Sequence, residues 1–175
     1  NLPVLVVVIP LLLAPILTII TAPRVAWAVS VAGIGSAFLA AILLQSITES
    51  IGRVTYHLGN WEPPWGIEFV VDSATSLTLV IMTGLAFLAT LYARASLLAE
   101  IKHTDLGKCY AAWLLASGGL FGLVATGDAF NLFVFLEISA LSSAILISMG
   151  AGSDRRALSA AFNYLLIGAV GATFY

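Results

Sequence analysis

The feature that most constrains this chain is a succession of long apolar segments separated by short polar ones. These segments cover residues 2–20, 25–47, 73–98, 109–126, 128–149 and 155–175. At about 1.5 Å of rise per residue, about 20 helical residues cross the roughly 30 Å hydrocarbon core of a bilayer. Because lipid offers no hydrogen-bond partners, such segments must satisfy their own backbone as helices. The sequence therefore predicts an all-α transmembrane bundle of about six spans that form a single membrane region over residues 1–175.

Composition supports a membrane protein and argues against several other classes. Hydrophobic residues make up 61% of the chain and charged residues only 9%, whereas soluble domains carry about 25% charged residues. The net charge of -2, without a basic run, gives no reason to expect nucleic acid. Cys109 is the single cysteine, and the two histidines, His57 and His103, fall in predicted loops. We therefore expect no metal, haem or other cofactor, and we expect a lipid bilayer around the chain.

The longest polar connection, residues 48–71, is predicted to be an external loop. Trp61 and Trp65 flank a pair of prolines there, which is typical of an aromatic belt at the membrane interface. Residues 66–71 alternate as a short strand or hairpin would. Asp72 follows at the position of a helix N-cap for the third span.

The positive charges of the chain predict its orientation in the membrane. With the N-terminus outside, six of the seven Lys and Arg residues face the cytoplasm: Arg24, Arg94, Lys102, Lys108, Arg155 and Arg156. Only Arg53 then faces outward. Because cytoplasmic loops carry the excess of Lys and Arg, an external N-terminus is predicted. We interpret Arg155, Arg156 and the two tryptophans of the loop as residues that set topology and contact the interface.

One acidic residue, Glu137, lies in the middle of an apolar segment. It is about 13 Å along the predicted helix from Asp128, near the midplane of the membrane. A carboxylate at this depth is costly unless it is protonated, paired or hydrated, so intramembrane acids usually mark ion pathways. We predict that Glu137 is a buried carboxylate that couples proton movement. The alternative is a protonated Glu137 that only hydrogen-bonds a neighbouring helix.

Four further polar residues are candidates for a proton path, and each has a structural alternative. Asp128 begins the same helix, where an N-cap role suffices to explain it. Ser142 and Ser143 lie off the face of Glu137, where they could hold water or accept a helix contact. Asn163 lies about two turns into the sixth segment, and a water site and a helix contact explain it equally well there.

These residues resemble a known family. The motif is Gly127-Asp128-x-Phe130-Asn131-Leu132-Phe133-Val134-Phe135-x-Glu137. It is similar to the fifth span of the antiporter-like subunits of respiratory complex I, Mrp-type cation/proton antiporters and membrane-bound hydrogenases. Residues 160–168 resemble the sixth span, and residues 66–72 resemble the approach to the third.

The resemblance implies a fold of about fourteen helices built from two inverted repeats. It also implies that the glutamate matched by Glu137 pairs with a lysine on a seventh span, and that changes in this ion pair drive protons through the membrane. We expect the chain to stop before that span. Family members often carry lysine where Asn163 stands, so a basic relay role does not transfer to this residue.

The predicted function is proton or cation/proton translocation in a complex with other membrane subunits, in the inner (plasma) membrane of a prokaryote. The transported ions would be protons and possible Na⁺ or K⁺ counter-ions. At most, the chain would be a proton-pumping subunit without a redox site of its own. The alternative is an accessory subunit that only scaffolds a complex, which the small-residue face of Ser117–Gly122 would suit.

Overall fold

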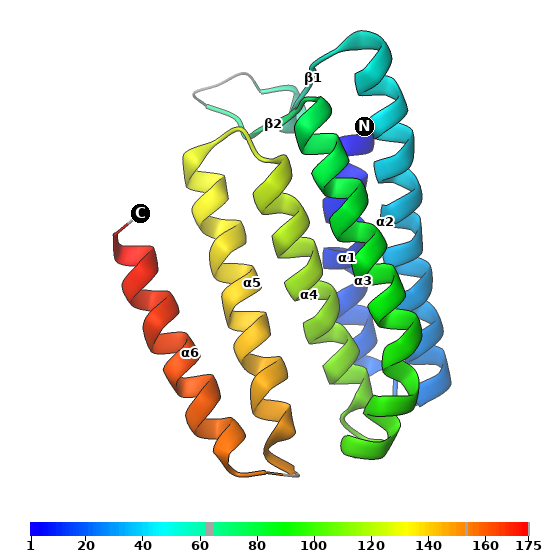
Figure 1. Ribbon diagram of the computed structural model, residues 1–175, viewed down its shortest axis with the longest axis vertical. Coiled ribbons are helices and arrows are strands. Elements are labelled where there is room, and N and C mark those ends of the chain that lie inside the picture. Colours follow the sequence, from blue (N-terminus) through cyan, green and yellow to red (C-terminus); the bar gives the residue numbers. More distant parts are fainter. Residues whose placement is uncertain (62–64, 153, 175) are drawn as a thin grey trace.

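The structure, a computed structural model that describes residues 1–61, 65–152 and 154–174, contains six α-helices and a small two-stranded sheet (Figure 1). The helices are α1 (Leu2–Ile19), α2 (Pro23–Ile51), α3 (Ser73–Glu100), α4 (Leu106–Ala125), α5 (Ala129–Met149) and α6 (Arg156–Thr173). The strands are β1 (Val54–His57) and β2 (Glu68–Val71), and two short 3-10 turns cover Leu58–Asn60 and Gly150–Gly152. The predicted all-α bundle is confirmed.

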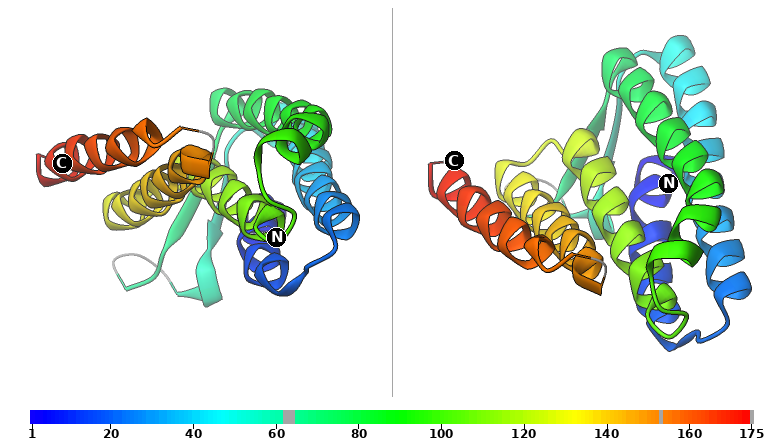
Figure 2. Two further views of the ribbon diagram at one scale, coloured as in Figure 1. Left: turned by 90° about the horizontal axis from the view of Figure 1, so that it is seen from below. Right: turned by 60° about the horizontal axis from the view of Figure 1, so that its bottom comes forward.

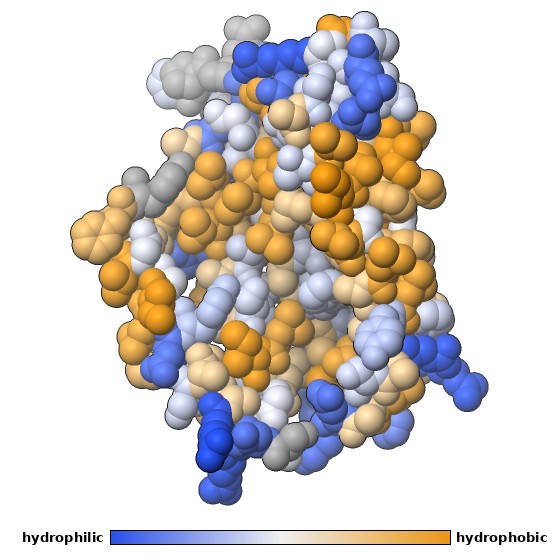
Figure 3. Space-filling view, viewed as in Figure 1, coloured by the Kyte–Doolittle hydropathy of each residue, from blue (hydrophilic) through white to orange (hydrophobic). Residues whose placement is uncertain are grey.

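Five of these helices, α1 to α5, are long and apolar enough to cross a membrane. Apolar side chains form a broad band around the middle of the visible face, and hydrophilic side chains gather at the two ends (Figure 3). Successive helices run in opposite directions (Figure 1). One end therefore carries the sheet and the α4–α5 turn, and we call it the sheet end. The other carries the α1–α2, α3–α4 and α5–α6 connections, and we call it the basic end.

Helix α4 is the central element of the bundle. It packs against α1 and α5, whereas α2 packs against α1 and α3. Two thirds of the α4 span is buried (67%), compared with 22% of α3 and of α5. Helix α6 contacts α5 and lies at the edge of the bundle (Figure 2). The arrangement of the other helices therefore depends on how closely each of them can pack against α4.

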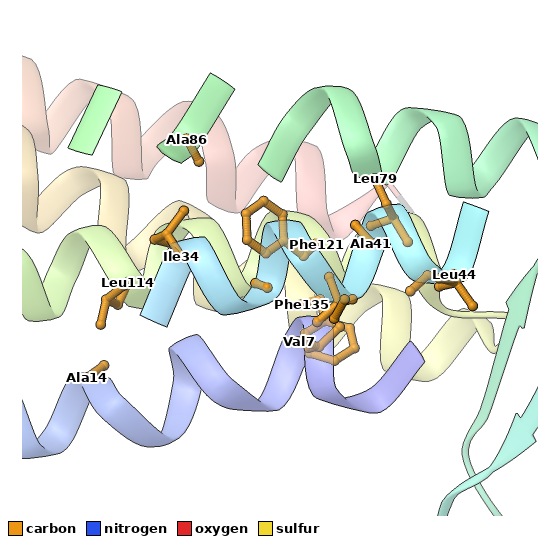
Figure 4. Packing of buried hydrophobic residues seen from close by; sticks show 14 of the residues in the cluster. Val7, Ala14, Ile34, Ala41, Leu44, Leu79, Ala86, Leu114, Phe121 and Phe135 are labelled. Carbon is orange, nitrogen blue, oxygen red and sulfur yellow. The ribbon is translucent and has the colours of Figure 1, made fainter. Parts of the chain in front are cut away.

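The core is formed by large side chains from several helices, with small residues between them. Phe121 of α4, Ile34 of α2 and Leu79 of α3 are almost completely buried (Figure 4). Alanines such as Ala37 and Ala41 fill the α2 side of the same cluster. Helices in lipid gain little from hydrophobic burial against each other, so close packing through small residues is the main source of their association.

Two glycines allow α5 to approach α4 closely. A Cβ added at Gly122 would lie 2.5 Å from the ring of Phe135, and one added at Gly119 would lie 2.9 Å from the backbone nitrogen of Ser139. Real Cβ atoms do not come this close to other atoms, so a larger residue at either position would force the ring of Phe135 or the backbone of α5 to move. The small-residue packing face predicted for Ser117–Gly122 is therefore confirmed.

The predicted external loop is more structured than the sequence indicated. Helix α2 continues to Ile51, four residues into the predicted loop of residues 48–71. The extension is stabilised across the helix pair, because the Thr48 and Ser76 hydroxyls are 2.8 Å apart and the Ser76 hydroxyl donates to Gln45 Oε1 at 2.6 Å. Hydrogen bonds between two helices are not visible in a local hydropathy pattern.

Strands β1 and β2 form an antiparallel pair in which Val54 lies opposite Val71 and His57 lies opposite Glu68. The strand predicted within residues 66–71 is confirmed as β2. Its partner β1 was not predicted, and it makes His57 a strand residue that pairs with Glu68 at 3.4 Å rather than a loop residue.

Asp72 caps α3, as predicted. Its carboxylate accepts a hydrogen bond from the Thr75 backbone N–H at 2.7 Å. This hydrogen bond is the main reason why the pKa of Asp72 lies below its ordinary value of 3.8. The charged form of the carboxylate is thus the better cap.

Replacing Gly122 by Ala should destabilise the purified protein by about 1–3 kcal/mol, because the new methyl group would overpack the α4–α5 contact. Thermal unfolding in detergent measures this effect. The matched control is Gly150→Ala, since a Cβ there would meet only the Ala157 methyl at an ordinary 3.6 Å. Equal stability of the two variants would contradict the tight α4–α5 packing.

The Asp72 cap should weaken in acid. Because the folded-state pKa lies below 3.8, the cap contributes fully above that pH and is lost as the pH falls through the lower folded-state pKa. The protection factor of the Thr75 amide, measured by hydrogen exchange, should therefore fall over this range. Asp72→Asn keeps the acceptor oxygen but does not titrate, so its protection should stay constant. The same acid dependence in both proteins would show that another group is responsible.

Candidate functional site

The sheet positions the start of α5. The Gly127 backbone N–H donates to the Glu68 carbonyl at 2.9 Å, and Phe69 forms an isolated bridge with Thr126. The ring of Phe69 also lies 6.2 Å, centre to centre, from the ring of Phe135 on α5. The turn between α4 and α5 is thus attached to β2 through the backbone, and the aromatic contact attaches α5 itself to the same strand.

A polar network then fixes the first turn of α5. Asp128 Oδ1 accepts from the Phe130 backbone N–H at 3.1 Å, so Asp128 is the N-cap of the helix. The side-chain amide of Asn131, which is 5% exposed, donates to Thr126 Oγ1 at 3.1 Å. The Asp128 backbone N–H donates to the same hydroxyl at 3.3 Å. Thr126 therefore joins the end of α4 to the beginning of α5.

Asn131 is not among the candidate residues predicted from the sequence, where it is only one position of the motif. The signal that could have identified it is its position three residues after the capping Asp128, where polar side chains commonly reach back to the start of a helix. Its burial next to Thr126 depends on tertiary packing, so the sequence does not show it.

One face of α5 is buried where the helix contacts α4. It carries Asn131, Phe135, Ser139 and Ser142, which follow one another at spacings of four, four and three residues. Each residue turns an α-helix by about 100°, so Glu137 lies about 200° around from Phe135. Glu137 therefore points away from α4, on the side of α5 that carries exposed Phe130 and Leu141.

Glu137, which the sequence predicts to be buried, is only half-buried in the structure. None of the acidic residues that the structure describes is buried. Among the described residues, His57 lies next to Glu68 and Lys108 forms an ion pair with Asp105, and Glu137 takes part in neither contact. The physical reason is helical phase: the rotation that buries Phe135 against α4 turns Glu137 outward.

The two serines of the predicted proton path have different surroundings. Ser142 is buried and donates to the Ile138 carbonyl at 2.7 Å, so its hydroxyl is satisfied within its own helix. Ser143 lines a mostly apolar groove of about 350 Å³, together with Met82 of α3 and Trp113 of α4. Neither serine is on the Glu137 side of α5.

The remaining candidates lie apart from Glu137. Asp128 is engaged as a cap, and Asn163 is exposed on α6. Arg155 and Arg156 are exposed at the start of α6, on the basic end, where Asp154 accepts from the Arg156 backbone N–H at 2.9 Å. Trp61 and Trp65 are exposed, by 66% and 87%, at the sheet end.

None of the hydrogen bonds found among the described residues connects Glu137 to the other proton-path candidates: Asp128, Asn163, Ser142 and Ser143. Within these residues, no group of three or more His, Cys, Asp or Glu side chains could hold a metal ion. The site is thus a single half-buried carboxylate on a helix whose start is fixed by the sheet.

An apolar bundle of membrane-length helices, with an acid in the middle of α5, defines a polytopic membrane protein. No family model matches the chain. It is 37% identical over 178 residues to NADH-quinone oxidoreductase subunit N of Desulforudis audaxviator (strain MP104C), covering 100% of this chain and 35% of that protein. It is 36% identical over 116 residues to a probable K⁺/H⁺ antiporter subunit of Rhizobium meliloti (strain 1021), covering 66% of this chain and 20% of that protein.

The fold is similar to a chain in the structure of the Mrp complex from Dietzia sp. DQ12-45-1b, with a TM-score of 0.83 and 25% sequence identity, over 98% of this chain and 32% of that chain. The chain spans about a third or less of the length of these relatives. It is a partial, N-terminal match to the antiporter-like membrane subunits, and the family predicted from the sequence motif is confirmed.

Removing the Thr126 hydroxyl with Thr126→Val should cost about 1–3 kcal/mol of stability, because the buried Asn131 amide loses its acceptor. The added change Asn131→Leu removes the donor as well, so the double variant should be destabilised by less than the sum of the single changes. Thermal unfolding in detergent measures the cycle. Thr173→Val is the control, since that exposed hydroxyl donates only within its own helix. Additive single effects would mean that the two side chains do not interact.

Proposed function

We propose that the protein moves protons, or exchanges a cation for protons, as an antiporter-like subunit, and that Glu137 is its coupling carboxylate. The observation that carries this proposal is the position of Glu137 inside α5, a helix of membrane length. It lies about 12 Å from the beginning of the helix and about 18 Å from its end. The relatives named as an antiporter subunit and an oxidoreductase subunit support the same function.

The physical basis is the cost of charge within a membrane. A neutral, protonated Glu137 is tolerated at this depth, whereas the carboxylate requires water or a nearby cation. A basic group that approaches the carboxylate therefore favours release of the proton, and its withdrawal favours uptake. The half-buried face of Glu137 leaves room for such a group, and the family resemblance implies that it is a lysine on a further span.

Other membrane subunits and the rest of the polypeptide are proposed to cover the outer faces of α5 and α6. Large apolar side chains on these helices are exposed, among them Phe130 at 72%, Phe162 at 60% and Ile167 at 74%. We also propose an external N-terminus in a prokaryotic inner membrane, because Arg24, Lys102 and similar residues gather at the basic end.

Glu137→Ala and Glu137→Gln should reduce coupled proton transport to the background of vesicles that lack the protein, and Glu137→Asp should retain part of it. The full-length protein, assembled with its complex, is assayed in inverted membrane vesicles by a fluorescent pH probe. The aspartate keeps a titratable carboxyl group, although one methylene shorter.

The matched control is Glu100→Gln, which removes an exposed carboxylate at the end of α3. Transport should be unchanged in this variant, and immunoblots should show equal amounts of assembled complex in every case. Normal transport by Glu137→Gln would disprove the coupling role.

The second candidate function is a scaffold that holds a complex together without moving ions. The tight α4–α5 contact at Gly119 and Gly122 favours it. A scaffold would tolerate Glu137→Gln in every assay, whereas bulky residues at Gly122 would reduce assembly. The transport measurement above therefore separates the two functions.

A further inference from the structure

Two grooves between α3 and α5 join to form one slot. A groove of about 350 Å³ and a groove of about 160 Å³ share Ala89 of α3, Trp113 of α4 and Leu146 of α5 in their linings. Helix α4 lies between α3 and α5 and forms the floor of the slot (Figure 1). Helices α3 and α5 form its two walls and scarcely contact each other. We call this space the α3–α5 slot.

The slot runs along the helices rather than across them. Its lining extends from Met82 to Leu97 on α3 and from Cys109 to Phe121 on α4. At about 1.5 Å of rise per residue, these stretches give a length of about 18–22 Å. Helices α3, α4 and α5 are all long and apolar enough to cross a membrane. The slot therefore lies at the depth of the lipid tails.

The width of the slot distinguishes between the occupants that a membrane offers. Spread over this length, the two volumes give a mean width of about 5 Å. A transmembrane helix is about 10 Å across and does not fit into such a space. A hydrocarbon chain is about 4 Å across, since this is the contact distance between carbon atoms. The dimensions therefore favour a single hydrocarbon chain.

The chemistry of the lining favours the same occupant. Of the described residues, none that lines the slot is charged. The indole N–H of Trp113 is already used, because it donates to the Thr90 hydroxyl at 2.8 Å. The remaining polar groups of the lining are the hydroxyls of Tyr110, Ser117 and Ser143 and one thiol. A charged headgroup would find no counter-ion there, so the slot is suited to the apolar part of a lipid.

We propose that the α3–α5 slot binds one acyl chain of a membrane lipid, extended along the helix axes. Each carbon adds about 1.3 Å to an extended chain with bonds of about 1.5 Å, so the slot holds about 14–17 carbons. The chain packs against Leu146 in the second half of α5. The first half is held differently, by the sheet at Gly127 and by the close contact between Gly122 and Phe135.

This site is separate from Glu137, and the proposal does not depend on the transport function. Its test uses bromine on an acyl chain, which quenches the fluorescence of a tryptophan in contact with it. The full-length protein, delipidated in a non-ionic detergent, is titrated with dibrominated phosphatidylcholine. The signal of Trp113 is the difference between the wild type and Trp113→Phe. Its quenching should saturate with a single lipid per protein, whereas quenching that rises without saturation would overturn the proposal.

A variant that fills the slot provides the second part of the test. Ala89→Phe places a ring in the space of the acyl chain and should weaken lipid binding at least about fivefold. The matched control is Ala95→Phe, because Ala95 is an exposed alanine of the same helix that lines neither groove. This control should change the affinity less than about twofold. An equal loss in both variants would contradict a site in the slot.

Competition by unbrominated lipids shows what the slot recognises, with the unmodified protein alone. Dipalmitoyl phosphatidylcholine and dipalmitoyl phosphatidylglycerol should restore the Trp113 fluorescence equally, because only the chain is bound. Dihexanoyl phosphatidylcholine should compete at least about tenfold less well, since its chains contact less than half of the lining. A clear preference for one headgroup would identify a headgroup site and overturn the proposal. Unquenched Trp113 would do the same, because a protein segment or water would then fill the slot.

Discussion

The close approach of α5 to α4 is the interaction on which the rest of the structure depends. Lipid removes most of the hydrophobic driving force between helices, so contact area and small residues decide which helices associate. Gly119 and Gly122 allow the backbone of Ser139 and the ring of Phe135 to reach α4. Because α1 also packs against α4, this one helix holds the early and late parts of the chain together.

The contact with α4 fixes the rotation of α5 about its own axis. This rotation decides which groups surround Glu137. With Phe135 against α4 and the helix start attached to β2 through Gly127, rotation of α5 about its axis is not free. Glu137 then lies on the outer side, half-buried. A carboxylate in this position is available to a partner that approaches from outside the described helices, as the proposed coupling role requires.

The two ends of the bundle differ in chemistry as well as in shape. The sheet end is built from backbone hydrogen bonds, caps and exposed tryptophans, whereas the basic end presents cations beside apolar grooves. The cations that predict the orientation, Arg24 and Lys102 among them, thus lie at the end opposite the sheet.

The amino-acid sequence alone determined the elements whose causes are local. Hydropathy over some twenty residues indicated the helices, Asp72 and Asp128 were recognisable as caps, and the motif ending at Glu137 indicated the family. The tertiary structure decided the pairing of β1 with β2, the role of Asn131, the outward position of Glu137 and the slot between α3 and α5. These depend on which helices flank each other and in what rotation. Because every span in this chain is apolar on most of its faces, its hydropathy pattern does not reveal which face packs inward.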